Sequence, residues 1–305
     1  MYGLIINGVR FMVVTHFGTP TWNKVKEFAK IKNSDFSIHE RYSERIVPTM
    51  LVGLTEITGV AFHDIGVLAG KYFVHFMCQY DYDKLLRVLG RRFSDFVKGL
   101  DNLHEYFRFS YTRLKPPSFY CEREDSKGIV LHYRSRRPSF LSYVIGILIE
   151  IATLFYETEV RVEILSKEER RGIQYNVLRI GYKNTDYKSD HEVRHQIRAQ
   201  NEYIPVDSVS FLQMFPFYIA FNKQMKILLT GVALSNLMSN LIGMQIDQEF
   251  DLVRPVIQFT YEGIRHYLNN IFKLQSMKPV LRKVSHAAVA FKVNDELLDR
   301  VDLPE

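Results

Sequence analysis

Apolar residues recur at helical spacing through the first half of the chain. They return every three or four positions, as they do on one face of an α-helix. This spacing predicts helices over residues 22–29, 49–58, 63–78, 82–88, 93–109 and 142–156. Pro116 and Pro117 must interrupt the helical pattern, because proline lacks a backbone N–H and clashes with the preceding turn.

A different period predicts strands later in this half. Apolar and polar residues alternate over residues 129–137, 159–165 and 175–182, which are rich in β-branched and aromatic side chains. A charged turn is predicted over residues 167–172. The first half is therefore expected to be mostly helical and to end in an antiparallel sheet.

The second half has a weaker pattern. Residues 187–203 are polar and show no sustained apolar face, which favours a linker. After them come an aromatic-rich segment at 211–221, a strand candidate at 225–230 and helix candidates at 233–241 and 263–270. With 305 residues and about 150 residues per domain, we predict two domains, at 1–182 and 206–305, and a linker at 183–205. The fold class is α+β.

Composition narrows the functional classes. The net charge of +6 and the isoelectric point of about 9.1 permit an acidic ligand without requiring nucleic acid. No DNA-binding motif is present, so we expect no nucleic-acid partner. Cys78 and Cys121 are too few for a disulfide scaffold and lack zinc-site spacing, which favours ordinary thiols in a reducing compartment.

No segment is predicted to enter a membrane. The apolar N-terminus lacks a preceding basic region and is interrupted by Arg10, unlike a signal peptide. The apolar residues 143–155 include Glu150 and are fewer than the ~20 that a spanning helix needs. We therefore interpret this stretch as a buried core helix and expect a cytoplasmic protein.

One histidine lies on an apolar helical stripe. His104 follows Leu100 by four positions in the helix predicted over 93–109, so it should face the core. By spacing alone, it could be a core histidine that bonds a carbonyl group. Alternatively, its imidazole could be a metal or heme ligand.

A row of hydrogen-bond donors is predicted on one strand face. Tyr133, Ser135 and Arg137 are two positions apart, so their side chains point to the same side of a strand. A phenol, a hydroxyl and a guanidinium suit a carboxylate or phosphate ligand. The alternative is an ordinary polar strand face. Together with His104, however, this row suits heme, whose iron takes a histidine and whose propionates take the donors.

At these residues the sequence resembles the heme nitric oxide/oxygen-binding (H-NOX) domain of soluble guanylate cyclases. The similar segments are MYGLI, LLRVLGRRFSDFVKGLDNLHEYF, PPSFYC and LHYRSRR, within residues 1–182. The resemblance implies heme b with His104 as the axial iron ligand, and propionates held by the motif Tyr133, Ser135 and Arg137. Keeping both features is typical of beta-type or atypical subunits.

The second half also resembles the same cyclases. FLQMFPFYIAFNKQM and FDLVRPVIQFTYEGIRHYLNNIFKLQS are similar to the PAS-like domain that follows H-NOX, dimerises and relays the signal. The resemblance fades after about residue 276, and the sequence given ends at Glu305 with no cyclase-like segment. The resemblance implies a guanylate cyclase, but we expect these residues not to make cyclic GMP by themselves.

The resemblance also places residues around the heme. Leu4 and Phe73 would be apolar pocket neighbours, and Pro117 would press on the heme from the proximal side unless it is a simple helix stop. Tyr143 would lie on the distal side, where oxygen-binding bacterial relatives carry a tyrosine and NO-selective relatives are apolar. Our hypothesis is that Tyr143 donates to bound O2; its hydroxyl could instead face solvent or a backbone carbonyl.

Three hypotheses for function follow. The first is a heme-based sensor of O2, NO or CO that regulates a guanylate cyclase and pairs with another cyclase subunit. The second is a non-catalytic dimerisation partner that dampens full-length subunits. The third is a heme-free binding module. His191 and His195 have helical i, i+4 spacing but no third ligand nearby, so we interpret them as surface histidines.

Replacing His104 separates the heme-free hypothesis from the other two. If His104 is the axial ligand, His104→Ala should abolish or strongly weaken heme retention, because no other protein atom holds the iron. Heme per protein in the purified chain, measured by absorbance, checks this. A variant that retains heme like the wild type would support the heme-free interpretation of His104.

Overall fold

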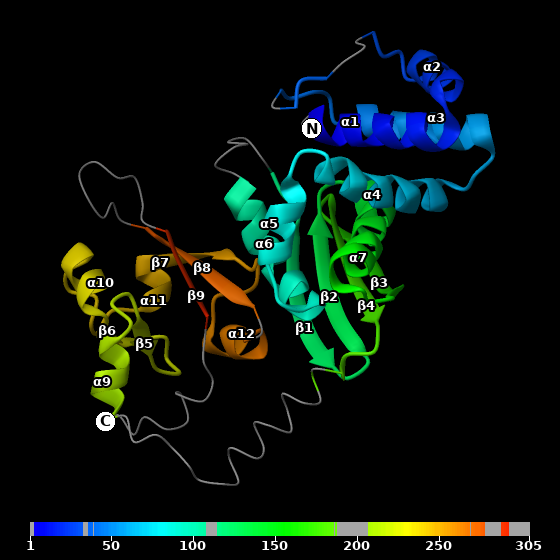
Figure 1. The fold of residues 1–305 in the computed structure, drawn as a ribbon. Coiled ribbons are helices and arrows are strands. Elements are labelled where there is room, and N and C mark those ends of the chain that lie inside the picture. Colours follow the sequence, from blue (N-terminus) through cyan, green and yellow to red (C-terminus); the bar gives the residue numbers. More distant parts are fainter. Residues whose placement is uncertain are drawn as a thin grey trace. The chain divides into compact units, whose positions relative to one another are not determined.

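The structure is a computed structural model that describes residues 3–32, 36–38, 40–107, 115–185, 187, 207–268, 270–277 and 288–292 (Figure 1). Helices and antiparallel strands are both present, which confirms the predicted α+β class. The predicted linker falls mostly outside the described residues. The domain boundaries stay a prediction.

The first half contains most of the helices. They are α1 (Gly3–Met12) with its π-helical continuation η1 (Val13–Phe17), α2 (Thr19–Phe28), α3 (Ile46–Thr58), α4 (Phe62–Cys78), α5 (Tyr82–Val88), α6 (Phe93–Phe107), the 3₁₀ turn η2 (Pro138–Phe140) and α7 (Leu141–Tyr156). All six predicted helices are confirmed, with small differences at their ends. Helix α1 was not predicted, although it is amphipathic and buries Ile6 and Val9.

A four-stranded sheet accompanies these helices. Its strands are β1 (Ser118–Asp125), β2 (Gly128–Ser135), β3 (Arg161–Arg170) and β4 (Ile173–Gly181), in the order β1-β2-β4-β3. The predicted turn over 167–172 is wrong, because β3 continues to Arg170 and pairs with Ile173. Only Arg171 and Gly172 turn the chain, with φ angles of 53° and 71°, as a two-residue hairpin requires. Most β3 side chains are exposed at the sheet edge, so the strand has a polar sequence.

The described elements of the second half are short. They are α9 (Ser208–Gln213), β5 (Ile219–Phe221), β6 (Ile227–Thr230), α10 (Val232–Leu237), α11 (Ile246–Glu249), β7 (Phe250–Arg254), α12 (Tyr261–His266), β8 (Ile271–Ser276) and β9 (Ala288–Lys292). Strands β5 and β6 pair, and β7-β8-β9 form a second sheet. The strand predicted at 225–230 is confirmed as β6, and the two predicted helices are present as the shorter α10 and α12. The other strands were not predicted.

The chain divides into two compact units that do not follow chain order. One unit comprises residues 1–97, 103–117 and 133–183. The other comprises residues 98–102, 118–132 and 184–305. Part of α6, all of β1 and most of β2 thus cluster with the C-terminal region.

Helices α4 and α7 of the first unit approach each other through glycines. A Cβ atom on Gly70 would lie 2.0 Å from the carbonyl oxygen of Tyr143. A Cβ atom on Gly146 would lie 2.0 Å from the carbonyl oxygen of Val67. Both distances are far below a van der Waals contact, so only glycine permits this packing. The contact fixes the position of α7, and therefore of Tyr143, against α4.

The apolar helix α7 also meets the length and composition of a membrane span. Among the described residues, Pro138–Tyr156 is the one such helix, or one of two if the bent pair of α3 and α4 is counted as a span. Half of this segment is buried inside the fold. Its packing on α4 agrees with the interpretation of residues 143–155 as a core helix.

Adding a methyl group at Gly70 tests this packing. Gly70→Ala should lower the free energy of unfolding by about 2–3 kcal/mol, because the clash is with backbone and no side chain can rotate away. Urea unfolding followed by circular dichroism measures it. Gly172→Asn is the control, since Gly172 lies in open space and asparagine tolerates its positive φ. Equal stability of the two variants would contradict the close approach of α4 and α7.

Candidate functional site

Helix α6 carries the candidate axial ligand. Its apolar stripe is buried as predicted, at Phe93, Phe96, Val97, Leu100 and Leu103. His104 is half-buried, at the margin of this stripe in the last turn of the helix. The predicted placement on a largely buried face is therefore met, although the imidazole is less enclosed than its apolar neighbours.

The predicted motif forms one cluster of donors at the end of β2. The strand predicted over 129–137 ends at Ser135, so Arg137 lies two residues beyond it. Tyr133 and Ser135 are both buried, and their side chains share a hydrogen bond. The backbone N–H of Arg137 donates to Ser135 Oγ at 3.1 Å. Burial raises the pKa of Tyr133, and the Ser135 bond and the Arg137 charge oppose this increase. The structure therefore brings the three predicted residues together.

The guanidinium of Arg137 already holds a carboxylate. Its Nε and Nη2 donate to the two carboxylate oxygens of Glu44 at 2.9 and 2.8 Å, and its Nη1 donates to the carbonyl oxygen of Lys115 at 3.1 Å. The Arg137 hydrogen bonds lower the pKa of Glu44. This fork shows that Arg137 has the geometry to bind a carboxylate with two parallel bonds. Glu44 was not predicted, because it lies 93 positions from Arg137 and belongs to no periodic pattern.

Tyr143 is buried, and its hydroxyl has no hydrogen-bond partner among the described residues. Its ring lies 5.6 Å from that of Phe73 and 5.5 Å from that of Phe140. Burial raises its pKa well above the ordinary value, so the hydroxyl is protonated and can donate. The hydroxyl therefore faces neither solvent nor, within the part of the chain that the structure describes, a backbone carbonyl group. A buried hydroxyl without a partner is unfavourable, which suits a ligand that accepts its proton.

The other predicted pocket residues are apolar neighbours. Leu4 is buried with Phe76 and Met77, and Phe73 and Phe107 pack against this cluster. Phe73 thus links the cluster to Tyr143, and Phe107 belongs to the helix of His104. Pro117 is half-buried and lies directly before β1.

These residues fit heme. They offer an imidazole on a largely buried helix face, a guanidinium fork with two hydroxyls for carboxylates, and an apolar region that contains the Tyr143 hydroxyl, which no described residue bonds. The imidazole suits the heme iron, the guanidinium and hydroxyls suit the propionates, and the apolar region with its hydroxyl suits the side where a gas would bind. His191 and His195, predicted as surface residues, lie outside the residues that the structure describes.

The two cysteines are free thiols. Cys121 is fully buried, and burial raises the pKa of its thiol to about 12. Cys78 is half-buried, with its pKa also raised by burial. Both are therefore protonated at neutral pH, in agreement with ordinary thiols.

Comparison with known proteins decides the family. Residues 2–164 match the haem-NO-binding family, and residues 204–300 match the family described as heme NO binding associated. The chain belongs to the haem-NO-binding family. The resemblance proposed from the sequence is thereby confirmed for both regions.

Curated relatives within this family are guanylate cyclases. Soluble guanylate cyclase gcy-33 of Caenorhabditis elegans is 46% identical over 99% of this chain and 32% of its own length. Soluble guanylate cyclase gcy-31 of the same organism is 36% identical over 92% of this chain and 40% of its own length. Soluble guanylate cyclase 89Db of Drosophila melanogaster is 31% identical over 76% of this chain and 37% of its own length. This chain thus spans about a third of the length of these relatives.

Solved structures agree on the fold. An oxygen-binding H-NOX domain related to soluble guanylate cyclases, in its oxygen complex, matches with a TM-score of 0.51 and 19% identity. The match covers 60% of this chain and 96% of that domain. A Cs H-NOX variant with 4-cyano-L-phenylalanine gives a TM-score of 0.55 at 18% identity, over 60% of this chain and 97% of that one. The first part of the chain therefore has the H-NOX fold.

Proposed function

We propose that this chain is the heme-binding, gas-sensing region of a soluble guanylate cyclase. The observation that carries the proposal is the presence of His104 together with the Tyr133, Ser135 and Arg137 cluster in a haem-NO-binding chain. We assign the sensor to residues 1–182, a linker to 183–205 and the PAS-like associated domain to 206–305.

Each part of the site has one role in this proposal. His104 is the axial ligand of heme b, and Tyr133, Ser135 and Arg137 hold its propionates. Leu4, Phe73 and Pro117 form apolar walls. Heme, when bound, would supply an iron that can take a diatomic gas.

Glu44 would influence how the propionates are held. Its carboxylate already takes the two donors of the Arg137 fork that a propionate needs. A propionate must therefore share the guanidinium with Glu44 or displace it. The Tyr133 and Ser135 hydroxyls are buried beside this pair and provide the remaining donors.

Tyr143 would set the choice between gases. O2 on ferrous heme gains from a hydrogen-bond donor, whereas NO binds strongly without one. The Tyr143 hydroxyl is protonated, buried and free to donate. We therefore propose that the site binds O2 as well as NO. It would also bind CO, for which the Tyr143 hydroxyl is not needed.

Signalling would pass through α6 to the second domain. His104 would connect the heme to α6, so a gas at the iron would act on the second domain through this helix. Coupling between two sites is typically worth about 1–3 kcal/mol. In the full-length cytoplasmic protein, this coupling would control the conversion of GTP to cyclic GMP, with another cyclase subunit as partner.

A second candidate function is a non-catalytic dimerisation partner that dampens full-length subunits. Its pairing step, which the first function shares, is supported by a set of exposed large apolar side chains in the second region that a pairing surface would cover. They are Met214, Phe215, Phe217, Val232, Ile242 and Met244.

Removing the Tyr143 hydroxyl tests the proposed gas selectivity. Tyr143→Phe should accelerate O2 dissociation about tenfold, which corresponds to one lost hydrogen bond of ~1–2 kcal/mol. NO affinity should stay unchanged. Stopped-flow absorbance of the heme-loaded chain measures both.

The matched control is Tyr156→Phe on the same helix. The Tyr156 hydroxyl bonds the carbonyl oxygen of Gly90 at 3.3 Å and does not approach Phe73 in any described contact. Its removal should leave O2 dissociation unchanged. An O2 dissociation rate in Tyr143→Phe equal to that of the wild type would reject Tyr143 as the donor.

A further inference from the structure

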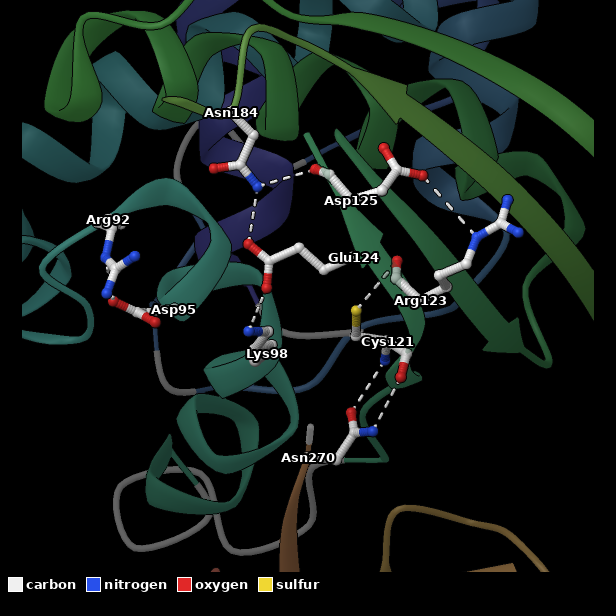
Figure 2. Close-up of polar contacts among 9 residues, drawn as sticks. All are labelled: Arg92, Asp95, Lys98, Cys121, Arg123, Glu124, Asp125, Asn184 and Asn270. Atoms are coloured by element: carbon white, nitrogen blue, oxygen red, sulfur yellow. Dashed lines mark hydrogen bonds and ion pairs between the residues drawn. The ribbon is translucent and has the colours of Figure 1, made fainter. Parts of the chain in front are cut away.

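One asparagine of the C-terminal region binds the backbone of β1. Asn270 lies immediately before β8, and Cys121 lies in the middle of β1 (Figure 2). Asn270 Oδ1 accepts from the Cys121 backbone N–H at 2.9 Å, and Asn270 Nδ2 donates to the Cys121 carbonyl oxygen at 2.9 Å. Both residues are buried. We call this pair of bonds the Asn270 clamp.

The clamp resembles the bonding of a neighbouring strand. In antiparallel sheets, one residue exchanges both its N–H and its C=O with its partner, and here a side-chain amide makes the same two bonds. β1 is an edge strand of the four-stranded sheet, so its outward backbone groups need partners when buried. The clamp provides them at Cys121.

The amide is fully used and can adopt only one orientation. Asn270 Nδ2 also donates to the carbonyl oxygen of Tyr267 at 2.9 Å, so each polar atom of the side chain has a partner. Exchanging its oxygen and nitrogen would place N–H against N–H and oxygen against oxygen. Only a carboxamide of this length satisfies both groups of Cys121, which makes the contact chemically specific.

β1 is in turn fastened to helix α6 through Asp101 and Lys98. Asp101 Oδ1 accepts from the Phe119 backbone N–H at 2.6 Å. Lys98 Nζ donates to Glu124 Oε2 at 2.5 Å (Figure 2). Because one bond lies on each side of Cys121, β1 and this part of α6 should move together. His104 follows Asp101 by one helical turn.

Two more contacts join the C-terminal region to α6 and β1. Arg254, at the end of β7, lies with its Nη1 3.6 Å from Asp101 Oδ1, and both side chains are nearly buried. The ring of Tyr267 meets that of Tyr120 edge-on, with 4.9 Å between the ring centroids. Residues 98–102 and 118–132 accordingly cluster with residues 184–305 in one compact unit.

We propose that the Asn270 clamp docks the C-terminal region onto β1 and, through β1 and α6, sets the ligand kinetics at His104. Asn270 is then a positioning residue that touches neither heme nor gas. The docking stands on the described contacts alone, and the effect on ligand kinetics rests on the proposed function.

The test uses the full chain with three substitutions. Asn270→Ala removes both bonds. Asn270→Asp keeps the size and the acceptor for the Cys121 N–H, but it places a carboxylate against the carbonyl oxygens of Cys121 and Tyr267, so it should fail as alanine does. Asn222→Ala is the control, because the described contacts of the Asn222 side chain are bonds from the backbone N–H groups of Gln224 and Lys226 in its own turn.

Hydrogen exchange of the peptide covering residues 118–125 reports docking without heme. Both Asn270 variants should exchange at least about tenfold faster there than the wild type, as expected when a buried bond is lost, and Asn222→Ala should not. Wild-type exchange in β1 for both Asn270 variants would overturn the docking. Using two variants, one of them isosteric, protects the test against misfolding of the alanine variant.

Dissociation of CO from the heme-loaded chain reports the coupling. The Asn270 variants should change its rate about fivefold or more, the lower end of typical coupling between sites, and Asn222→Ala should not. Faster exchange in β1 with an unchanged CO rate would overturn the coupling to His104. If the wild type itself holds no heme, the proposed function fails, and hydrogen exchange still decides the docking.

Discussion

The contact between α4 and α7 is the constraint on which the candidate site depends. Glycines at 70 and 146 let the two backbones touch, so α7 has one position relative to α4. That position buries Tyr143 beside Phe73 and leaves its hydroxyl without a partner among the described residues. Because α7 follows β2 through the short turn η2, the same constraint also locates the Tyr133, Ser135 and Arg137 cluster. The proposed distal donor and propionate site thus depend on one packing contact.

Helix α6 joins the proposed chemistry to the C-terminal region. Its last turn carries His104, and its preceding turn carries Asp101, which accepts from β1 and lies beside Arg254. A displacement of His104 along this helix would therefore reach the backbone of β1 within one turn. The Asn270 clamp holds the middle of that strand. The same bonds would also carry an effect from the C-terminal region to His104, since coupling between two binding equilibria is reciprocal.

Much of the fold could be predicted because it follows local periods. Helices α4, α5 and α7 end within a residue of their predicted bounds, since their apolar spacing is continuous and Gly59 marks the break after α3. Strand β1 escaped prediction because its buried first half is followed by four consecutive charged residues. Strand β3 was cut short because an exposed edge strand has no apolar alternation.

The candidate site likewise contains residues that local spacing predicts and residues that it does not. Tyr133 and Ser135 share one face of β2, so their spacing alone predicted that they lie together. Arg137 lies beyond the end of β2 and joins them through its backbone N–H, which donates to Ser135 Oγ. Glu44 and Asn270 could not be found, because each is a single polar residue whose partner lies 93 or 149 positions away. Only the tertiary structure joins such pairs.

The visible spectrum of the chain purified with heme tests the central claim most directly. It should be recorded after reduction without air, then with O2, then with NO. The account predicts a Soret band from ferrous heme with a single histidine ligand, which shifts with NO and also with O2. A folded protein without any Soret band would contradict heme binding, and a ferrous spectrum that responds to NO but ignores O2 would contradict the donor role of Tyr143.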